Sequence, residues 1–455
     1  MKPPLKSPGR RRRPASTAPR RWPWALALAF GLGAVAAVSF NSGLRRSSSP
    51  VPPPRQLQFW TLELSPRFDG YMRAAIKQWE HQHPGVTVRW TDLPWGSVER
   101  KLLAAVYART APDLVNLNPL FGANLASKGG LLPLDPLLPA GSASTYLPRV
   151  WQAGQVGGEQ VAIPWYLTAR ISLANSALLQ QAGYTRPPRR WQEVPAFAEA
   201  VRRRTGRYAL FVTVVPDDSA ELLESMVQMD VVLVDGRHRA AFNTPAGRRA
   251  FAFWTDLYRR GLLPREVVSQ GYRRAVELYQ GGDLALLSTG PEFLRAIQTN
   301  APRVAARTAP YPPITGPGGQ TNVAVMNLSI PRQSRMAPEA LSLALFLTNP
   351  SNQQRFAEQA RVLPSASVAL EAMQRQLEQE RPPAAPERLV REARLLSTRS
   401  LAGAEVLVPA SPGVKRLQAI LYTQLQRAML GQVSSDEALA TAAFEWNRYA
   451  EARWP

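Results

Sequence analysis

The sequence predicts an α/β fold with a largely parallel sheet, and three observations support this. Short apolar runs alternate with amphipathic stretches from residue 57 onward, which is the pattern of strands and helices in layered α/β proteins. From about residue 178 the pattern becomes mostly helical. Apolar residues make up 45% of the 455 residues, and 12 residues are tryptophans, so the chain can bury large cores.

Strands and helices alternate in the first part of this region. Short apolar runs predict the strands, and apolar residues at spacings of four and three, such as Met72, Ile76 and Trp79, predict the helices. The predicted strands are Leu57–Leu62, Val86–Trp90 and Leu114–Leu117, and the predicted helices are Phe68–His81, Val98–Ala108 and Asn124–Gly129.

Helices dominate the later part. The clearest is Ala246–Arg260, because Thr244 and Pro245 supply a cap and a favoured first position and Gly261 supplies the C-terminal stop. The other predicted helices are Trp191–Arg204, Leu341–Leu347, Gln353–Ala360, Pro386–Ser397 and Leu417–Gly431, and strand-like runs are Ile163–Pro164, Leu284–Ser288 and Val323–Ile330.

The N-terminal segment predicts export. The net charge is +22, but 11 of the 55 basic residues and none of the 33 acidic ones lie in residues 1–55. The run Arg10–Arg13 precedes the apolar segment Trp22–Phe40, which is the pattern of a secretory signal. This segment is nearly long enough to span a bilayer, so an uncleaved anchor stays open as an alternative. A basic arm that binds nucleic acid does not explain the apolar run.

We therefore expect a signal peptide or signal anchor at residues 1–40 and a Ser/Pro-rich spacer at residues 41–56. The protein is then periplasmic, either free or tethered to the inner membrane by residues 22–40. We expect no nucleic acid among its partners.

Several kinds of chemistry are excluded by what the sequence lacks. It has no cysteine, which rules out disulfides and thiolate metal sites. Its three histidines are His81, His83 and His238, and none stands in an H-E-x-x-H motif. There is no G-x-x-x-x-G-K-[ST] phosphate loop, and no span of 18 apolar residues follows the signal. We expect no catalytic residue, no metal and no cofactor.

The order of motifs along residues 57–450 resembles family 1 of the bacterial extracellular solute-binding proteins, which includes maltose-binding protein. No single motif is specific, but ten of them occur in the family's order. The clearest are APDLVNL at Ala111–Leu117, GGEQVAIPW at Gly157–Trp165, the segment Phe242–Pro264, GGDLALLSTGP at Gly281–Pro291 and MLGQVSSDEALATA at Met429–Ala442.

This resemblance implies a two-lobed periplasmic-binding-protein fold with three interlobe crossings and a ligand cleft between the lobes. The expected N-terminal lobe comprises residues 57–167 and 289–330, and the C-terminal lobe comprises residues 168–288 and 331–455. Crossings near Thr168, Ser288 and Ile330 would act as a hinge that closes on the ligand. The implied function is that of a monomer that binds a sugar or glycoside and delivers it to the permease subunits of an ABC importer.

A sugar cleft needs aromatic plates with hydrogen-bonding groups between them, placed at the carboxyl ends of strands. Trp165 and Tyr166 at the first crossing are the expected main aromatic pair, whereas Trp191 and Trp254 are expected in the core because they lie on amphipathic helices. The candidate ligand-binding residues are Trp60, Glu63, Asp92, Trp95, Asn118, Phe121, Trp165, Tyr166, Gly290, Phe293, Tyr311 and Asn322.

Other functions remain as alternatives. A phosphorylated sugar or a glycerol phosphodiester would suit the arginine surplus, with Arg170 as its natural partner, although Arg170 could equally be a surface charge. A glycan-acting enzyme would need two carboxylates that flank a glycosidic bond, and only Glu63 and Asp92 could be assigned to that role. Polyamine and iron ligands are disfavoured, because the folded part is net basic and lacks clustered tyrosines.

Overall fold

The computed structural model describes residues 55–454 except 217, 382–383, 386 and 409–412. The predicted signal or anchor at residues 1–40, and the predicted spacer up to residue 54, lie outside the described residues. No helix in the part of the chain that the structure describes is long and apolar enough to cross a membrane. Two separate hydrophobic cores divide the compact unit of residues 53–455 into two lobes.

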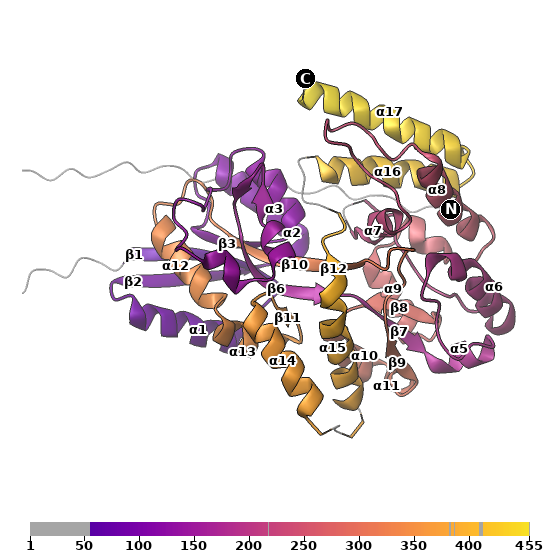
Figure 1. Cartoon of the computed structure of the whole chain (residues 1–455), viewed down its shortest axis with the longest axis horizontal. Helices are drawn as coiled ribbons and strands as arrows, with labels where there is room; N and C mark the ends of the chain where they lie inside the picture. The colour runs from indigo at the N-terminus through magenta and orange to yellow at the C-terminus, as the bar shows by residue number, and fades with distance from the viewer. Residues whose placement is uncertain (1–54, 217, 382–383, 386, 409–412, 455) are drawn as a thin grey trace, which may run out of the picture. The chain divides into compact units, whose positions relative to one another are not determined.

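The first lobe is built on a mixed sheet with the strand order β11-β6-β10-β3-β1-β2, and β12 pairs with β10. In Figure 1 the indigo N-terminal elements and the orange helices α12–α14 form this lobe together. Its strands are β1 (Arg55–Leu62), β2 (Val86–Leu93), β3 (Leu114–Leu117), β6 (Ile163–Ala169), β10 (Thr321–Ser329), β11 (Leu363–Pro364) and β12 (Ala404–Glu405), and its helices are α1 (Asp69–Gln82), α2 (Trp95–Tyr107), α3 (Pro119–Ala126), α4 (Pro148–Gln152), α12 (Ala337–Leu347), α13 (Pro350–Ala360) and α14 (Ser367–Gln379).

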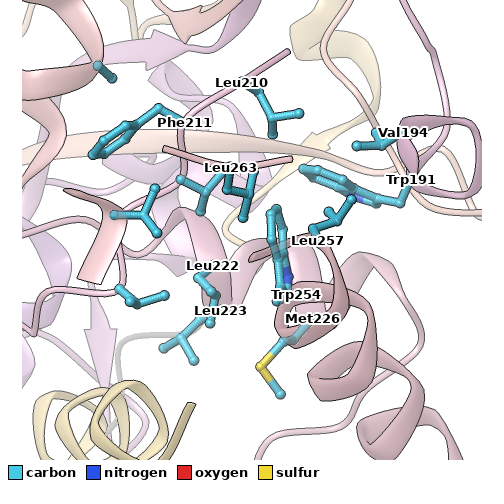
Figure 2. Close-up of a cluster of buried hydrophobic side chains, with 14 of the residues drawn as sticks. Trp191, Val194, Leu210, Phe211, Leu222, Leu223, Met226, Trp254, Leu257 and Leu263 are labelled. Atoms are coloured by element: carbon cyan, nitrogen blue, oxygen red, sulfur yellow. The ribbon is translucent and has the colours of Figure 1, made fainter. Parts of the chain in front are cut away.

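The second lobe has a small antiparallel sheet with the order β8-β7-β9 and many more helices. Figure 2 shows part of its core, where the rings of Trp191 and Trp254 meet edge to face with centroids 5.5 Å apart. Both tryptophans are buried, which confirms their prediction as core residues. The strands are β7 (Ile171–Asn175), β8 (Leu286–Thr289) and β9 (Thr308–Tyr311), and the helices include α5 (Ser176–Gln181), α6 (Val194–Thr205), α7 (Glu221–Gln228), α8 (Pro245–Arg259), α9 (Tyr272–Gln280), α10 (Leu294–Asn300), α11 (Pro302–Ala305), α16 (Val414–Met429) and α17 (Ser435–Arg453).

Within the described residues, three segments connect the sheet of the first lobe with elements of the second lobe. Arg170 is the single residue between β6 of the first lobe and β7 of the second. The second crossing is residues 312–320 between β9 and β10, and the third follows β12 and reaches the second core at Val408. Helix α15 (Glu387–Ser400) lies between the lobes and contacts strands of both (Figure 1).

The observed partition differs from the predicted one in two segments. Leu294 and Ile297 belong to the second core, although residues 289–330 were expected in the first lobe. Helices α12–α14 pack on the first core, although residues 331–455 were expected in the second lobe. Their amphipathic pattern shows that they cover a sheet, but the pattern does not identify which sheet. The expected crossings near Ser288 and Ile330 therefore lie within lobes.

The expectation of a largely parallel sheet holds for β1, β2 and β3, and β12 also pairs in parallel with β10, whereas the other pairings of the first sheet are antiparallel. Strand β10 runs opposite to both of its main neighbours, so it pairs antiparallel with β3 and with β6. This reversal is a long-range property of the crossings, which apolar patterns of single strands do not report.

Helix starts follow local capping chemistry. Helix α3 begins at Pro119 rather than near Asn124, because the side chain of Asn118 accepts a hydrogen bond from the Phe121 backbone N–H at 2.8 Å. Helix α8 begins at Pro245 after the Thr244 cap, as predicted. Helix α2 begins at Trp95, three residues earlier than predicted, where the Glu63 carboxylate accepts the Trp95 backbone N–H.

Candidate functional site

A cleft of about 450 Å³ lies between the lobes. The start of β10 and the crossing segments form its inner wall, with the apolar run Val323–Met326 at its centre. Helices α2 and α3 border it on the first lobe, and α7, α9 and α16 border it on the second. The side chains that line it include Trp95, Asn118, Leu120, Tyr166, Thr168, Arg170, Asp218, Ser219, Glu224, Tyr272, Asn322, Val408, Lys415 and Gln418.

Trp95 is the exposed aromatic ring of the first-lobe wall, with 43% of its surface accessible. Helix α2 lacks a side-chain cap of its own, and the Glu63 carboxylate instead accepts the Trp95 backbone N–H at 3.2 Å. An acceptor at a helix N-terminus satisfies one of its unpaired N–H groups, which explains why the helix starts here. Glu63 therefore positions Trp95.

Asp92 fixes the loop that carries Glu63. In the parallel register of β1 and β2, Asp92 stands opposite Thr61 and accepts its hydroxyl at 2.6 Å. The same carboxylate accepts the backbone N–H groups of Leu64 and Ser65, each at 3.1 Å. Both carboxylate oxygens of Asp92 thus accept hydrogen bonds from the loop that carries Glu63, and these bonds hold the first-lobe wall in place.

Strand β6 presents alternate side chains to the cleft. Tyr166, Thr168 and the following Arg170 line the cleft, whereas Trp165 and Leu167 point into the first core. Successive side chains of a strand face opposite sides, so Trp165 and Tyr166 do not face the same cleft. Burial raises the pKa of Tyr166 well above its ordinary value, so its phenol stays protonated and available as a hydrogen-bond donor.

Arg170 occupies the first crossing and faces two buried carboxylates of α7. Its guanidinium lies 3.6 Å from Glu221 and 3.8 Å from Glu224, and it donates a 3.4 Å hydrogen bond to Ser219. Burial alone would lower the pKa of Arg170, but the two carboxylates raise it above its ordinary value. Asn322 of β10 donates to the other Glu224 oxygen at 2.8 Å. This cluster therefore joins the first crossing, α7 and the first-lobe sheet.

The remaining charged groups of the cleft are also paired within the chain. Lys415 of α16 forms an ion pair with Glu99 of α2. Asp218 accepts the Tyr272 backbone N–H at 2.6 Å. The loop that carries Asp218 is held by α16, because the neighbouring Ser219 carbonyl accepts Gln418 at 2.8 Å and Tyr422 at 2.6 Å.

Two carboxyl groups near Arg170 have unusual proton affinities. Burial raises the pKa of Glu224 from 4.5 to about 7, and Arg170 opposes that shift only in part. Burial likewise raises the pKa of Glu292 to about 7. Because both groups keep their protons in the folded protein at pH values where exposed carboxyls are ionised, the folded state binds more protons than the unfolded state. The free energy of unfolding should therefore fall as the pH rises from about 4.5 to about 7.

The isosteric change Glu224→Gln should remove one of these two contributions. Each group contributes at most about 1.4 kcal/mol per pH unit to the slope of stability against pH. We expect the variant to lose about half of the decline between pH 5 and pH 7, measured by urea unfolding at a series of pH values. Gln keeps the acceptor for Asn322, so the contact between the lobes is retained. An unchanged slope would mean that Glu224 titrates as an exposed carboxyl.

The structure brings four of the twelve sequence-predicted residues to the cleft surface: Trp95, Asn118, Tyr166 and Asn322. Glu63 and Asp92 lie behind the wall and position it, as described above. The first core contains Phe121 and Trp165, and Trp60 packs against that core, and none of these three rings lines the cleft. The second lobe holds Gly290, Phe293 and Tyr311: Gly290 precedes a short 3₁₀ turn, Phe293 packs edge to face on Tyr272 at 5.8 Å, and Tyr311 lies on β9.

The cleft residues that the sequence interpretation missed include Thr168, Asp218, Glu224, Tyr272, Lys415 and Gln418. Thr168 was predictable from its spacing of two from Tyr166. Glu224 carries a weaker signal, since Glu221 and Glu224 flank the apolar pair Leu222 and Leu223 and are both buried. Asp218, Tyr272 and the α16 residues reach the cleft only through tertiary packing. Arg170, considered for a phosphorylated ligand, is partly enclosed in the cleft wall and is not a free surface charge.

The family model for bacterial extracellular solute-binding proteins matches residues 65–354, which is more than half of the chain. The chain belongs to this family. A crystal structure of a solute-binding protein from Synechococcus sp. MITs9220, which is proposed to be an oligosaccharide periplasmic-binding protein, is 67% identical to it. That match covers 88% of this chain and all of the other, with a TM-score of 0.84. This match supports the two-lobed fold of this solute-binding protein independently of the two hydrophobic cores.

More distant relatives extend the comparison. A Deinococcus radiodurans protein that is proposed to be an ABC transporter-binding protein is 25% identical over 250 residues, which cover 52% of this chain and 59% of that protein. A mannitol-binding protein of Pseudomonas aeruginosa is 24% identical over 225 residues, which cover 47% of this chain and 50% of that protein. The matched part thus spans somewhat more than half the length of the first of these relatives.

The Synechococcus protein has also been crystallised in complex with zinc. In this solute-binding protein, the described residues contain no group of three or more His, Asp or Glu side chains placed to hold a metal ion. The carboxylates of the cleft are instead paired with Arg170, Asn322 and a backbone N–H.

Proposed function

We propose that this protein is exported, binds a neutral sugar or glycoside in the interlobe cleft without changing it, and delivers it to the permease of an ABC importer. The observation that carries the proposal is the pairing of charges in the cleft. The lining includes two cations, Arg170 and Lys415, and two anions, Asp218 and Glu224, and each has a partner within the chain. A neutral ligand disturbs none of these pairs.

A phosphorylated ligand is disfavoured by the same electrostatics. A phosphate that approached Arg170 would also approach Glu221 and Glu224, which lie 3.6 and 3.8 Å from the guanidinium. Lys415 is already paired with Glu99. A phosphate would have to break one of these pairs before either cation could bind it, at the cost of an unpaired charge.

The uncharged groups of the cleft suit a sugar. A pyranose has an apolar face and a rim of hydroxyls, and Trp95 and the run Val323–Met326 provide apolar contact surface. Tyr166, Thr168 and Asn118 provide hydrogen-bonding groups on the first lobe, and Gln418 provides one on the second. A ligand that contacts both lobes binds the closed form better and therefore shifts the balance toward it.

Relatives support the choice of ligand class and of transporter. The Synechococcus relative is proposed to bind oligosaccharides, one Pseudomonas relative binds mannitol, and the Deinococcus relative is proposed to serve an ABC transporter. The extracellular character of the family supports export of the chain.

A thermal-shift screen tests the proposal directly. The panel contains mono-, di- and trisaccharides, glycosides, sugar phosphates and polyamines. We expect at least one neutral member to raise the melting temperature and to be recovered unchanged after incubation. A clear shift with polyamines but with no sugar would contradict the ligand class, and hydrolysis of the sugar would contradict binding without chemistry.

Trp95→Ala should weaken binding of the sugar that the screen identifies by about tenfold, because it removes the exposed aromatic surface of the cleft. Titration calorimetry measures the affinity. Tyr107→Ala is the matched control, since Tyr107 lies on the same helix, is 78% exposed and does not line the cleft. Equal affinities of Trp95→Ala and the unmodified protein would remove Trp95 from the binding surface.

A further inference from the structure

One ion pair connects helices of the two lobes directly. Glu99 lies on α2, whose buried face packs on the first core, and Lys415 lies on α16, whose buried face packs on the second. Each side chain is 31% exposed, so the pair is partly shielded from water. Asn124 of α3 donates to the other Glu99 oxygen at 3.3 Å, which anchors this carboxylate to the first lobe.

The position of Lys415 is not explained by the stability of its own helix. It is the second residue of α16, and a positive charge at a helix N-terminus is unfavourable because the helix dipole is positive there. Glu99 of the other lobe lies beside it and offsets this cost. The pair therefore favours the arrangement in which the two lobes are together.

The ion pair is coupled to the cleft by helix geometry. Glu99 is four residues after Trp95 on α2, so the two side chains share one face of the helix. Lys415 itself lines the cleft. Separation of Glu99 from Lys415 would therefore draw Trp95 away from a ligand held by the second lobe.

A second polar contact between the lobes lies next to a crossing. Asn322, which donates a hydrogen bond to Glu224, is the second residue of β10, two residues after the end of the crossing of residues 312–320. Glu99, by contrast, is far in sequence from all three crossings, on an element that a hinge motion carries with its lobe.

We propose that Glu99 and Lys415 form a latch that holds the lobes closed over the cleft and prolongs the residence of the ligand. The effect on residence rests on the proposed binding function, whereas the effect on closure is measurable without any ligand. Because charge pairs at this degree of exposure are screened by salt, the latch weakens as ionic strength rises.

Spin labels on the two lobes test the latch. The sequence contains no cysteine, so Tyr107→Cys and Phe444→Cys, at positions 78% and 63% exposed, give one label on each lobe. In the background of Glu99→Gln, we expect the distribution of label distances to shift from the closed distance toward longer distances. In the unmodified background, 1 M salt should produce the same shift, since the Debye length falls to about 3 Å. The charge exchange Glu99→Lys with Lys415→Glu should restore closure.

Glu266→Gln is the matched control, because it removes a similarly exposed ion pair with Arg274 that lies wholly within the second lobe. It should leave the label distances unchanged.

For the panel sugar that binds most tightly, Lys415→Met should raise the dissociation rate constant about threefold to tenfold. Unchanged distances in Glu99→Gln at both salt concentrations would overturn the latch and leave the proposed function intact. A latch that responds as expected in a protein that binds no panel sugar would contradict the proposed function alone.

Discussion

Arg170→Met is expected to be among the most damaging single substitutions in the cleft. It leaves Glu221 and Glu224, both buried, without the guanidinium that lies within 4 Å of each. Removal of one partner from a buried charge cluster typically costs about 3–5 kcal/mol, because the remaining charges are uncompensated. Urea unfolding at pH 8, where Glu224 with its pKa of about 7 is mostly ionised, should show a loss of this size, and binding of the panel sugar should be abolished.

The pH and a second substitution separate charge from packing. At pH 5, where Glu224 with its pKa of about 7 is largely protonated, the loss of stability in Arg170→Met should be smaller. Adding Glu224→Gln should restore part of the stability at pH 8. Arg207→Met is the control, since its ion pair with Asp283 is exposed and should contribute about 1 kcal/mol or less. A similarly small loss in Arg170→Met would mean that Arg170 is an ordinary surface charge.

Trp165→Ala should reduce stability by about 3–5 kcal/mol, because it removes a fully buried ring from the first core. Trp165 has no accessible surface and stacks on Phe356 with ring centroids 5.1 Å apart. The sequence suggested the opposite behaviour, a ligand-stacking ring whose loss weakens binding alone. Urea unfolding monitored by circular dichroism distinguishes the two.

Trp95→Ala provides the contrast for Trp165→Ala. Its ring is partly exposed at the cleft, so its stability should change by less than about 1 kcal/mol while its affinity falls. If Trp165→Ala instead unfolds at the same urea concentration as the unmodified protein and binds less sugar, then Trp165 contacts the ligand.

The sequence predicts most elements of the fold, because they follow from local physics. The period of apolar residues identifies α1, α8 and α16 within a few residues of their ends. The same patterns do not predict which lobe each helix packs on. Helices α12–α14 return to the first lobe after β10, and only the long-range pairing of β10 with β3 and β6 explains why.

The candidate site was predicted only in part, because local patterns identify residues at strand ends but do not identify pairs of residues that are far apart in sequence. Residues at the ends of neighbouring parallel strands, such as Asp92, lie near the cleft as the topology requires. Trp165 and Tyr166 were both assigned to the ligand, although the alternation of a strand allows only one of the two to face it. The pairs Arg170–Glu224 and Glu99–Lys415 join segments far apart in sequence, so no local pattern could reveal them.

Calorimetric titration with a matched pair of ligands tests most directly whether the cleft binds a neutral sugar. The pair is a neutral sugar that responds in the thermal-shift screen and its phosphate ester. The paired charges of the cleft predict one binding site for the neutral sugar and an affinity at least about tenfold lower for the phosphate ester, as the cost of an unpaired charge requires. Tighter binding of the phosphate ester would contradict the account, because it would show that Arg170 or Lys415 is available to an anion.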